Sequence, residues 1–180
     1  MIYIFLANGF EECEALVPLD ILRRAGIEIK TVGIGSKTVI GSHGIPVVCD
    51  LEEKEVSKNE LKGIILPGGM PGTINLENNS IVQEYIDFSY ENNLLIAAIC
   101  AAPSILGHKN LLIGKKATCF PGFEKDLLGA NVVNNPVERD ENIITAFGAG
   151  AAFPFGFEIL SYINGQKSSE EMQKQMRYTK

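Results

Sequence analysis

Short apolar segments alternate with longer amphipathic segments along the chain. Runs of branched and aromatic residues bounded by Gly, Pro or Asn are typical of strands, whereas apolar residues three or four positions apart are typical of helices. The pattern predicts strands at residues 2–6, 27–34, 64–66, 94–99, 116–120 and 143–146, a β-hairpin at 38–48, and helices at 11–25, 79–92, 155–163 and 167–176. This alternation indicates an α/β fold with a largely parallel sheet. No linker or internal repeat interrupts the pattern, so residues 1–180 are interpreted as a single domain.

The apolar run at residues 94–99 leads directly to a cysteine. A continuous apolar run is typical of a strand covered on both faces of a parallel sheet. Here it enters a short predicted helix through the sequence Ala97-Ala-Ile-Cys100-Ala-Ala-Pro103. Small residues around such a strand-to-helix turn are typical of a nucleophile elbow. Ligands of open α/β sheets bind beyond the carboxyl ends of the strands, where the turn Pro67-Gly68-Gly69 is also expected.

This position predicts a reactive role for Cys100. The N-terminus of the following helix favours negative charge, so we expect the thiol pKa to be lowered. The N–H groups of Ala101, Ala102 and Gly69 could hold an oxyanion. The alternative is that Cys100 is a small buried hydrophobic residue. The other three cysteines have no such setting and are assigned no chemistry; they are Cys13, Cys49 and Cys119.

Three glutamates stand where the first strand becomes a helix. Glu11 and Glu12 are interpreted as residues that favour the helix N-terminus. Glu14 lies among apolar neighbours, and burial beside Cys100 would raise its pKa and keep it protonated near neutral pH. Glu14 is therefore the candidate proton partner of the cysteine.

Composition and charge argue against several classes of function. The net charge is −6, which is unfavourable for a nucleic-acid surface. We expect no membrane partner, since no apolar run reaches the roughly 20 residues of a bilayer span. The first residues carry no basic region of a secretory signal, so we expect a cytoplasmic protein with reduced thiols. The chain has no CxxC pair and only two histidines, so we expect no metal and no cofactor.

Taken together, these motifs resemble the DJ-1/ThiJ/PfpI superfamily over nearly the whole chain. The resemblance is carried by three segments: residues 9–26, Leu66-Pro-Gly-Gly69, and Ala97-Ala-Ile-Cys100-Ala-Ala-Pro103. It implies a flavodoxin-like, three-layer α/β/α sandwich in which Glu14 partners Cys100 and the backbone of Gly69 and Ala101 faces the sulfur. It also implies a homodimer with the cysteine site near the interface. We expect the first helix to take part through Leu16, Leu19 and Arg24.

The chain departs from the superfamily pattern at several positions. Ala101 stands where the peptidase-like branch has a histidine, and no histidine follows His108, which excludes a class I glutamine amidotransferase. Phe120 stands where a histidine often occurs, and His43 and Phe147 stand near the positions of two arginines that line the site. His43, Phe120 and Gly68 are therefore possible site-lining residues, although a lone histidine in a hairpin is more often a surface residue. His108 is interpreted as structural.

Two functions from different classes remain open. The first is a cofactor-free enzyme of glyoxalase or deglycase type, a lyase or hydrolase acting on reactive dicarbonyls through Cys100 and Glu14. The second is an oxidative-stress sensor or chaperone in which peroxide converts Cys100 to a sulfinic acid. Thiamine-precursor metabolism and peptidase activity have less support. The expected partners are thus a small reactive carbonyl or peroxide and a second copy of the chain.

Overall fold

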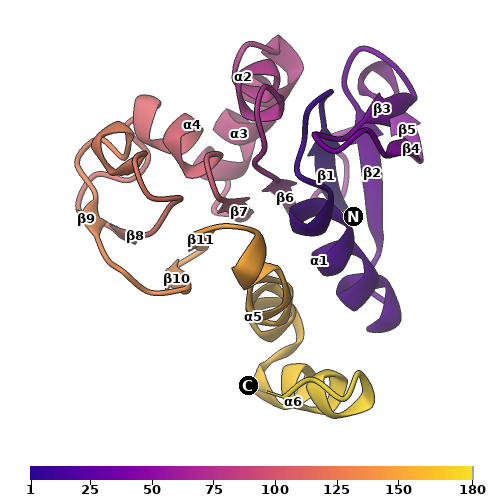
Figure 1. Cartoon of the computed structure of the whole chain (residues 1–180), viewed down its shortest axis with the longest axis vertical. Coiled ribbons are helices and arrows are strands. Elements are labelled where there is room, and N and C mark those ends of the chain that lie inside the picture. The colour runs from indigo at the N-terminus through magenta and orange to yellow at the C-terminus, as the bar shows by residue number, and fades with distance from the viewer. Residues whose placement is uncertain (180) are drawn as a thin grey trace.

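A seven-stranded sheet forms the centre of the computed structural model, which describes residues 1–179 (Figure 1). Its strands are β1 (Ile2–Leu6), β2 (Ile29–Gly33), β5 (Leu51–Glu52), β6 (Gly63–Leu66), β7 (Leu95–Ile99), β10 (Val137–Asp140) and β11 (Ile143–Ala146). They lie in the order β10-β11-β7-β6-β1-β2-β5. The β10–β11 pair is antiparallel and the other pairs are parallel. The carboxyl ends of β1, β6 and β7 therefore meet at one edge of the sheet.

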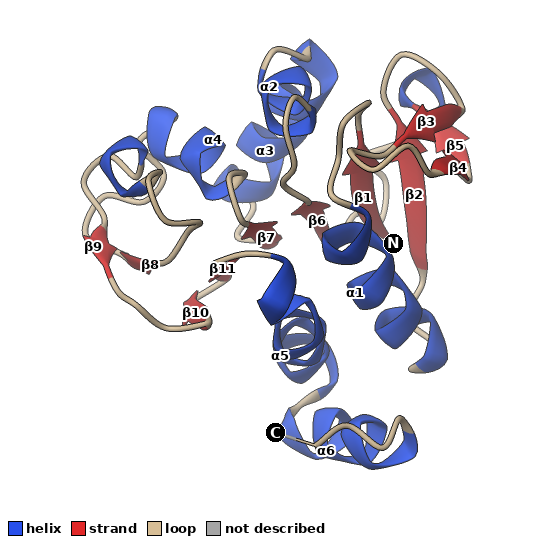
Figure 2. Cartoon of the chain, viewed as in Figure 1, coloured by secondary structure: helices blue, strands red, loops and turns tan. Residues whose placement is uncertain are grey.

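Helices cover both faces of this sheet, which gives three layers (Figure 2). One face is covered by α1 (Glu12–Arg24) and α5 (Ala152–Asn164), and α6 (Gln166–Gln175) packs outside α5. The other face is covered by α2 (Gly72–Glu77), α3 (Ser80–Glu91) and α4 (Pro103–His108). Among the described residues, no helix is both long and apolar enough to cross a membrane. The α/β sandwich with a mostly parallel sheet confirms the fold predicted from the sequence.

Alternate residues of the central strands supply two separate cores. Ile4 of β1 and Ile65 of β6 face the core beneath α1 and α5. Phe5 and Ile64, one position along each strand, face the core beneath α3 and α4. Because strand side chains alternate between faces, a strand buried on both faces must be apolar throughout. This explains the continuous apolar runs in the sequence.

The smaller elements agree with the predictions only in part. The predicted hairpin forms from β3 (Thr38–Ile40) and β4 (Pro46–Val48), which pair antiparallel. The strand predicted at residues 116–120 is wrong beyond residue 117. There β8 (Lys116–Ala117) pairs only with β9 (Asn131–Val132), outside the main sheet. Beyond β8, the Thr118 N–H donates to the Thr145 hydroxyl oxygen at 2.9 Å and the Phe120 N–H donates to the Cys100 carbonyl oxygen at 2.8 Å, so neither extends the pairing with β9. The described residues also form three single-turn 3₁₀ helices: η1 (Glu53–Glu55), η2 (Glu124–Asp126) and η3 (Ala149–Ala151).

Candidate active site at the Cys100 elbow

Cys100 lies in the tight turn between β7 and α4. Its φ angle is +65°, in the left-handed region that residues with a Cβ rarely adopt. Two backbone hydrogen bonds hold it there: the Cys100 N–H donates to Ala146 at 2.8 Å, and its carbonyl accepts from Phe120 at 2.8 Å. A strained residue held by its neighbours at a strand-to-helix junction has the geometry of a nucleophile elbow. The sharp turn predicted from the sequence is confirmed.

Glu14, in the first turn of α1, is the charged partner that reaches this turn. Its side chain is 1% exposed, accepts a hydrogen bond from the Gly68 N–H at 2.9 Å, and bonds to the Cys100 side chain. Burial raises the pKa of Glu14 to about 7, against the hydrogen bonds from Cys100 and Gly68, which lower it. The nearby charge of Glu11 raises the pKa further. The expectation of a buried glutamate with a raised pKa is confirmed.

The thiol of Cys100 behaves differently from the sequence-based expectation. Burial, followed by the Glu14 charge and the hydrogen bond to Glu14, raises its pKa to about 12. Hydrogen bonds from the N–H groups of Gly69 and Ala101 act in the opposite direction. The expectation that the following helix alone lowers this pKa is wrong. That helix is only six residues long, and a buried carboxylate next to the sulfur outweighs its field.

Glu14 and Cys100 therefore titrate as a pair. With the Glu14 pKa near 7 and the thiol pKa raised, the pair gives up one proton near neutral pH and holds the other until the solution is strongly alkaline. The remaining proton has two places to reside, the carboxyl group and the sulfur. A proton that moves between a carboxyl and a thiol is what a nucleophile with an internal acid requires.

Glycines bring the strand ends close enough for this contact. A Cβ on Gly68 would lie 2.6 Å from the Cβ of Cys100 and 2.7 Å from the Glu14 Oε2 atom. A Cβ on Gly69 would lie 2.4 Å from the backbone nitrogen of Glu11. All three distances are shorter than real Cβ contacts, so the turn after β6 accepts only glycine without displacing the site.

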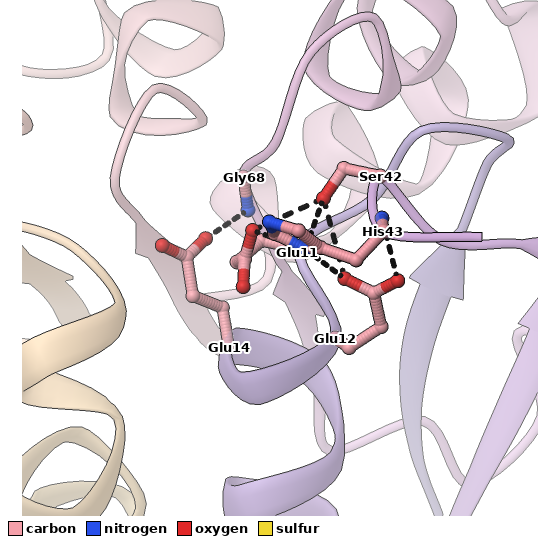
Figure 3. A network of polar contacts seen from close by, with 6 residues as sticks. All are labelled: Glu11, Glu12, Glu14, Ser42, His43 and Gly68. Carbon is pink, nitrogen blue, oxygen red and sulfur yellow. Dashed lines mark hydrogen bonds and ion pairs between the residues drawn. The ribbon is translucent and has the colours of Figure 1, made fainter. Parts of the chain in front are cut away.

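A second polar network lies beside the pair, at the turn of the β3–β4 hairpin (Figure 3). The Ser42 hydroxyl lies 3.1 Å from Glu11 Oε2 and 3.2 Å from Glu12 Oε2. Glu12 accepts from the backbone N–H of His43 and contacts its Nδ1, both at 2.8 Å. Although burial opposes ionisation, the bonds from His43 lower the pKa of Glu12 to about 2. The same contacts raise the pKa of His43.

This network corrects the interpretation of Glu11 and Glu12. Glu11 occupies the N-cap position of α1, yet its side chain makes no capping hydrogen bond. The two carboxylates instead fasten the hairpin turn to the start of α1. The sequence did not predict the contacts of Ser42 and His43 with Glu11 and Glu12, since no local pattern relates residues about thirty positions apart.

The comparisons with known proteins agree with this geometry. The model of the DJ-1/PfpI family matches residues 1–162. The chain belongs to the DJ-1/PfpI family.

Individual members of the DJ-1/PfpI family resemble the chain over nearly its full length. It is 32% identical to Protein dj-1beta of Drosophila melanogaster over 174 residues, covering 95% of the chain and 93% of that protein. A cysteine-to-alanine mutant of a DJ-1 superfamily protein from Salmonella typhimurium has a TM-score of 0.94 at 32% identity, covering 99% of the chain and 98% of its own. Oxidized DJ-1 from Toxoplasma gondii has a TM-score of 0.95 at 27% identity, with coverages of 99% and 98%.

The other sequence-predicted site residues differ in how close they lie to the pair. Phe120 is 47% exposed; its backbone bonds to Cys100, and a Cβ on Gly148 would lie 3.2 Å from its ring. The His43 side chain is 68% exposed and is bonded to Glu12 and Ser42. The structure therefore favours the interpretation of His43 as a surface residue of the hairpin. His108 bonds to Glu77 at 2.6 Å, in keeping with its structural interpretation.

Proposed function

We propose that the chain is a cofactor-free enzyme acting on reactive dicarbonyls such as methylglyoxal, with Cys100 as nucleophile and Glu14 as proton carrier. One observation carries the proposal: a buried glutamate with a pKa near 7 is bonded to a cysteine held in a strained elbow. A carboxyl group with that pKa can both donate and accept a proton at neutral pH. In the reactive form, we propose, the shared proton lies on Glu14 and the sulfur is a thiolate.

The proposed reaction uses groups already present at the elbow. The Cys100 sulfur attacks the aldehyde carbon, the aldehyde oxygen takes up a proton, and a hemithioacetal forms. The N–H groups of Gly69 and Ala101, which bond to the sulfur in the free protein, are near enough to stabilise the developing oxyanion. Glu14 then takes the proton from the former aldehyde carbon and returns it to the ketone carbon, while the hydroxyl proton passes to the ketone oxygen, which yields a lactoyl thioester on Cys100. Water hydrolyses the thioester, so methylglyoxal plus water gives lactate and the free thiol.

A steady-state assay with methylglyoxal tests this proposal. Cys100→Ala should abolish turnover, whereas Cys13→Ala, which removes an exposed thiol of the same helix as Glu14, should not. Glu14→Gln should lower kcat by ~100-fold or more, because an amide cannot exchange a proton at neutral pH. Full activity in Glu14→Gln would remove Glu14 from the mechanism.

A second function is favoured by the hydrogen-bond donors around the sulfur. Gly69, Ala101 and a protonated Glu14 could all donate to the oxygens of a Cys100 sulfinic acid. A relative from Toxoplasma gondii is described as oxidized. Two equivalents of peroxide would each transfer one oxygen to the sulfur and leave as water. A mass gain of about 32 Da on Cys100 after mild peroxide, without methylglyoxal turnover, would favour this role.

The remaining features of the proposal concern the whole protein. We propose one domain over residues 1–180, a cytoplasmic location and a homodimer in which α1 takes part. The family relationship supports the dimer, and Arg24 is exposed at the end of α1, whereas Leu19 is buried in the core of its own chain.

A further inference from the structure

Two glutamates are hydrogen-bonded to the same glycine, Gly68, which lies against Cys100. The Glu11 N–H donates to the Gly68 carbonyl at 2.9 Å, and the Gly68 N–H donates to Glu14 at 2.9 Å. Gly68 in turn lies against Cys100, with only 2.6 Å between a Cβ built on the glycine and the Cβ of the cysteine. Glu11 is thus held next to the reactive pair by the same turn that forms it.

The side chain of Glu11 is fixed in this position and its charge reaches the site. Its Oε2 atom accepts from the Ser42 hydroxyl at 3.1 Å, and the side chain is 19% exposed (Figure 3). His43, the cation of this network, lies closer to Glu12 (2.8 Å) than to Glu11 (3.5 Å). His43 is hydrogen-bonded to Glu12, and the charges of both carboxylates raise the pKa of His43. The charge of Glu11 acts on Glu14, whose pKa it raises.

The other side of the elbow is apolar. Cys100 donates its N–H to Ala146, which precedes Phe147, and accepts from the N–H of Phe120. Phe147 packs against the same core as Cys100, and the Phe120 side chain is exposed beside it. The charge of Glu11 thus acts on the carboxyl partner of Cys100, whereas the residues on the other side of the elbow, Phe120 and Phe147, carry no charge.

We propose that Glu11 is a specificity-determining residue that makes the Cys100 site select uncharged electrophiles over carboxylate-bearing ones. This inference rests on the Cys100-centred site of the proposed function and names its substrate class. A carboxylate on the substrate is repelled by Glu11, whereas a neutral carbonyl compound is not. Two unit charges several Å apart in a partly solvated site repel by ~1.4 kcal/mol, or about tenfold in rate.

Two alkylating reagents of the same shape and different charge test the inference without requiring turnover. Iodoacetamide is neutral and iodoacetate is anionic, and both transfer a two-carbon group to a thiolate. The rate constants for Cys100 would be measured by mass spectrometry in the native protein and in Glu11→Gln, whose amide still accepts from Ser42. We expect the native protein to prefer iodoacetamide, and the preference to fall about tenfold in Glu11→Gln. Added salt should reduce the native preference as well.

Glu91→Gln is the matched control. Glu91 is exposed and ends α3, before β7 begins, whereas Cys100 lies beyond the other end of β7. The same charge change at this distance should leave the preference within twofold of the native value. An equal fall in both variants, or no fall in Glu11→Gln, would overturn the inference. If the native protein turns over methylglyoxal but Glu11→Gln has the native reagent preference, the proposed function stands and only the role of Glu11 is overturned. A tenfold fall of the reagent preference in Glu11→Gln, without methylglyoxal turnover in the native protein, would support the role of Glu11 and remove the proposed function.

Discussion

At the scale of single residues, Glu14 and Cys100 are each held in a state that is unfavourable in isolation. The ionisable carboxyl group of Glu14 is buried, and Cys100 has a left-handed backbone conformation that costs of order 1–3 kcal/mol. Each group offsets part of the other's cost, because the carboxyl bonds to the sulfur and to the Gly68 N–H. The chemistry of the site therefore depends on how protons divide between these two side chains.

The raised pKa of Glu14 makes the stability of the protein depend on pH. The folded-state pKa of Glu14 is about 7, above the ordinary glutamate value of 4.5, so the folded chain holds this proton more tightly than the unfolded chain. Its contribution to stability is complete below about pH 4.5 and is lost as the pH rises through 7. Glu14→Gln lacks this titration, so its stability relative to the native protein should rise by about 3 kcal/mol between pH 4 and pH 8. Urea unfolding at both pH values measures this, and a difference that does not change with pH would contradict it.

The position of the shared proton can be read from the reactivity of Cys100. The Glu14 charge raises the pKa of the Cys100 thiol, and Glu14→Gln removes that charge while keeping a hydrogen-bond donor. We therefore expect the midpoint of the Cys100 alkylation curve to move to lower pH in Glu14→Gln. The measurement is iodoacetamide labelling across pH, with Cys13 as an internal reference. An unchanged midpoint would show instead that the proton already lies on Glu14 beside a thiolate in the native protein.

At the scale of elements, the site is formed by turns at the carboxyl ends of β6 and β7 and by the first turn of α1. The turn after β6 supplies N–H groups to both partners, from Gly68 to Glu14 and from Gly69 to Cys100. Its closeness to β7 depends on the absence of a side chain at Gly68. The elements thus fix the distance between acid and nucleophile through their backbones.

Gly68→Ala should therefore separate the pair. The new methyl group would overlap Cys100 and Glu14, so we expect alkylation of Cys100 to change and methylglyoxal turnover to fall by at least tenfold. Gly150→Ala is the control, because a Cβ there meets only the Phe147 ring at 3.9 Å. Circular dichroism would check that both variants fold. Native turnover in Gly68→Ala would show that the turn can shift without loss of the site.

At the scale of the whole molecule, the strand order brings the site together. Because β1, β6 and β7 are adjacent and parallel, the segments that follow them lie at one edge of the sheet. The helix that starts beyond β1 carries Glu14 near its start and Arg24 at its end. A subunit contact along α1 would therefore adjoin the site.

The dimer is tested by charge reversal on two helices. Light scattering at micromolar concentration should give twice the 19.6 kDa mass of one chain. Arg24→Glu on α1 should shift the protein toward the monomer, whereas Lys174→Glu on α6 should not, since we expect residues 168–180 to make no subunit contact by themselves. A monomeric native protein, or equal effects of the two reversals, would contradict the proposed interface.

The sequence by itself determined the layered fold and the position of the elbow. Strands such as β7 are recognisable because burial on both faces requires an apolar residue at every position. The turn at Cys100 was predictable because its small neighbours are local in sequence. The raised pKa of Glu14 followed from its apolar neighbours, since burial acts on a carboxyl group whatever covers it.

Only the tertiary structure decided what depends on contacts between distant residues. The thiol pKa is raised because the sulfur is buried and because the Glu14 carboxylate of α1 lies against it, and together these effects outweigh the nearby helix end. Glu11 and Glu12 bind the hairpin turn at Ser42 and His43, about thirty residues away, rather than capping the helix. Beyond the strand at Lys116, the N–H groups of Thr118 and Phe120 bond to Thr145 and Cys100, which are distant in sequence. In each case the deciding hydrogen bond or charge comes from a residue that is distant in sequence. Such a residue becomes a neighbour only when the chain has folded, so the local sequence pattern does not reveal it.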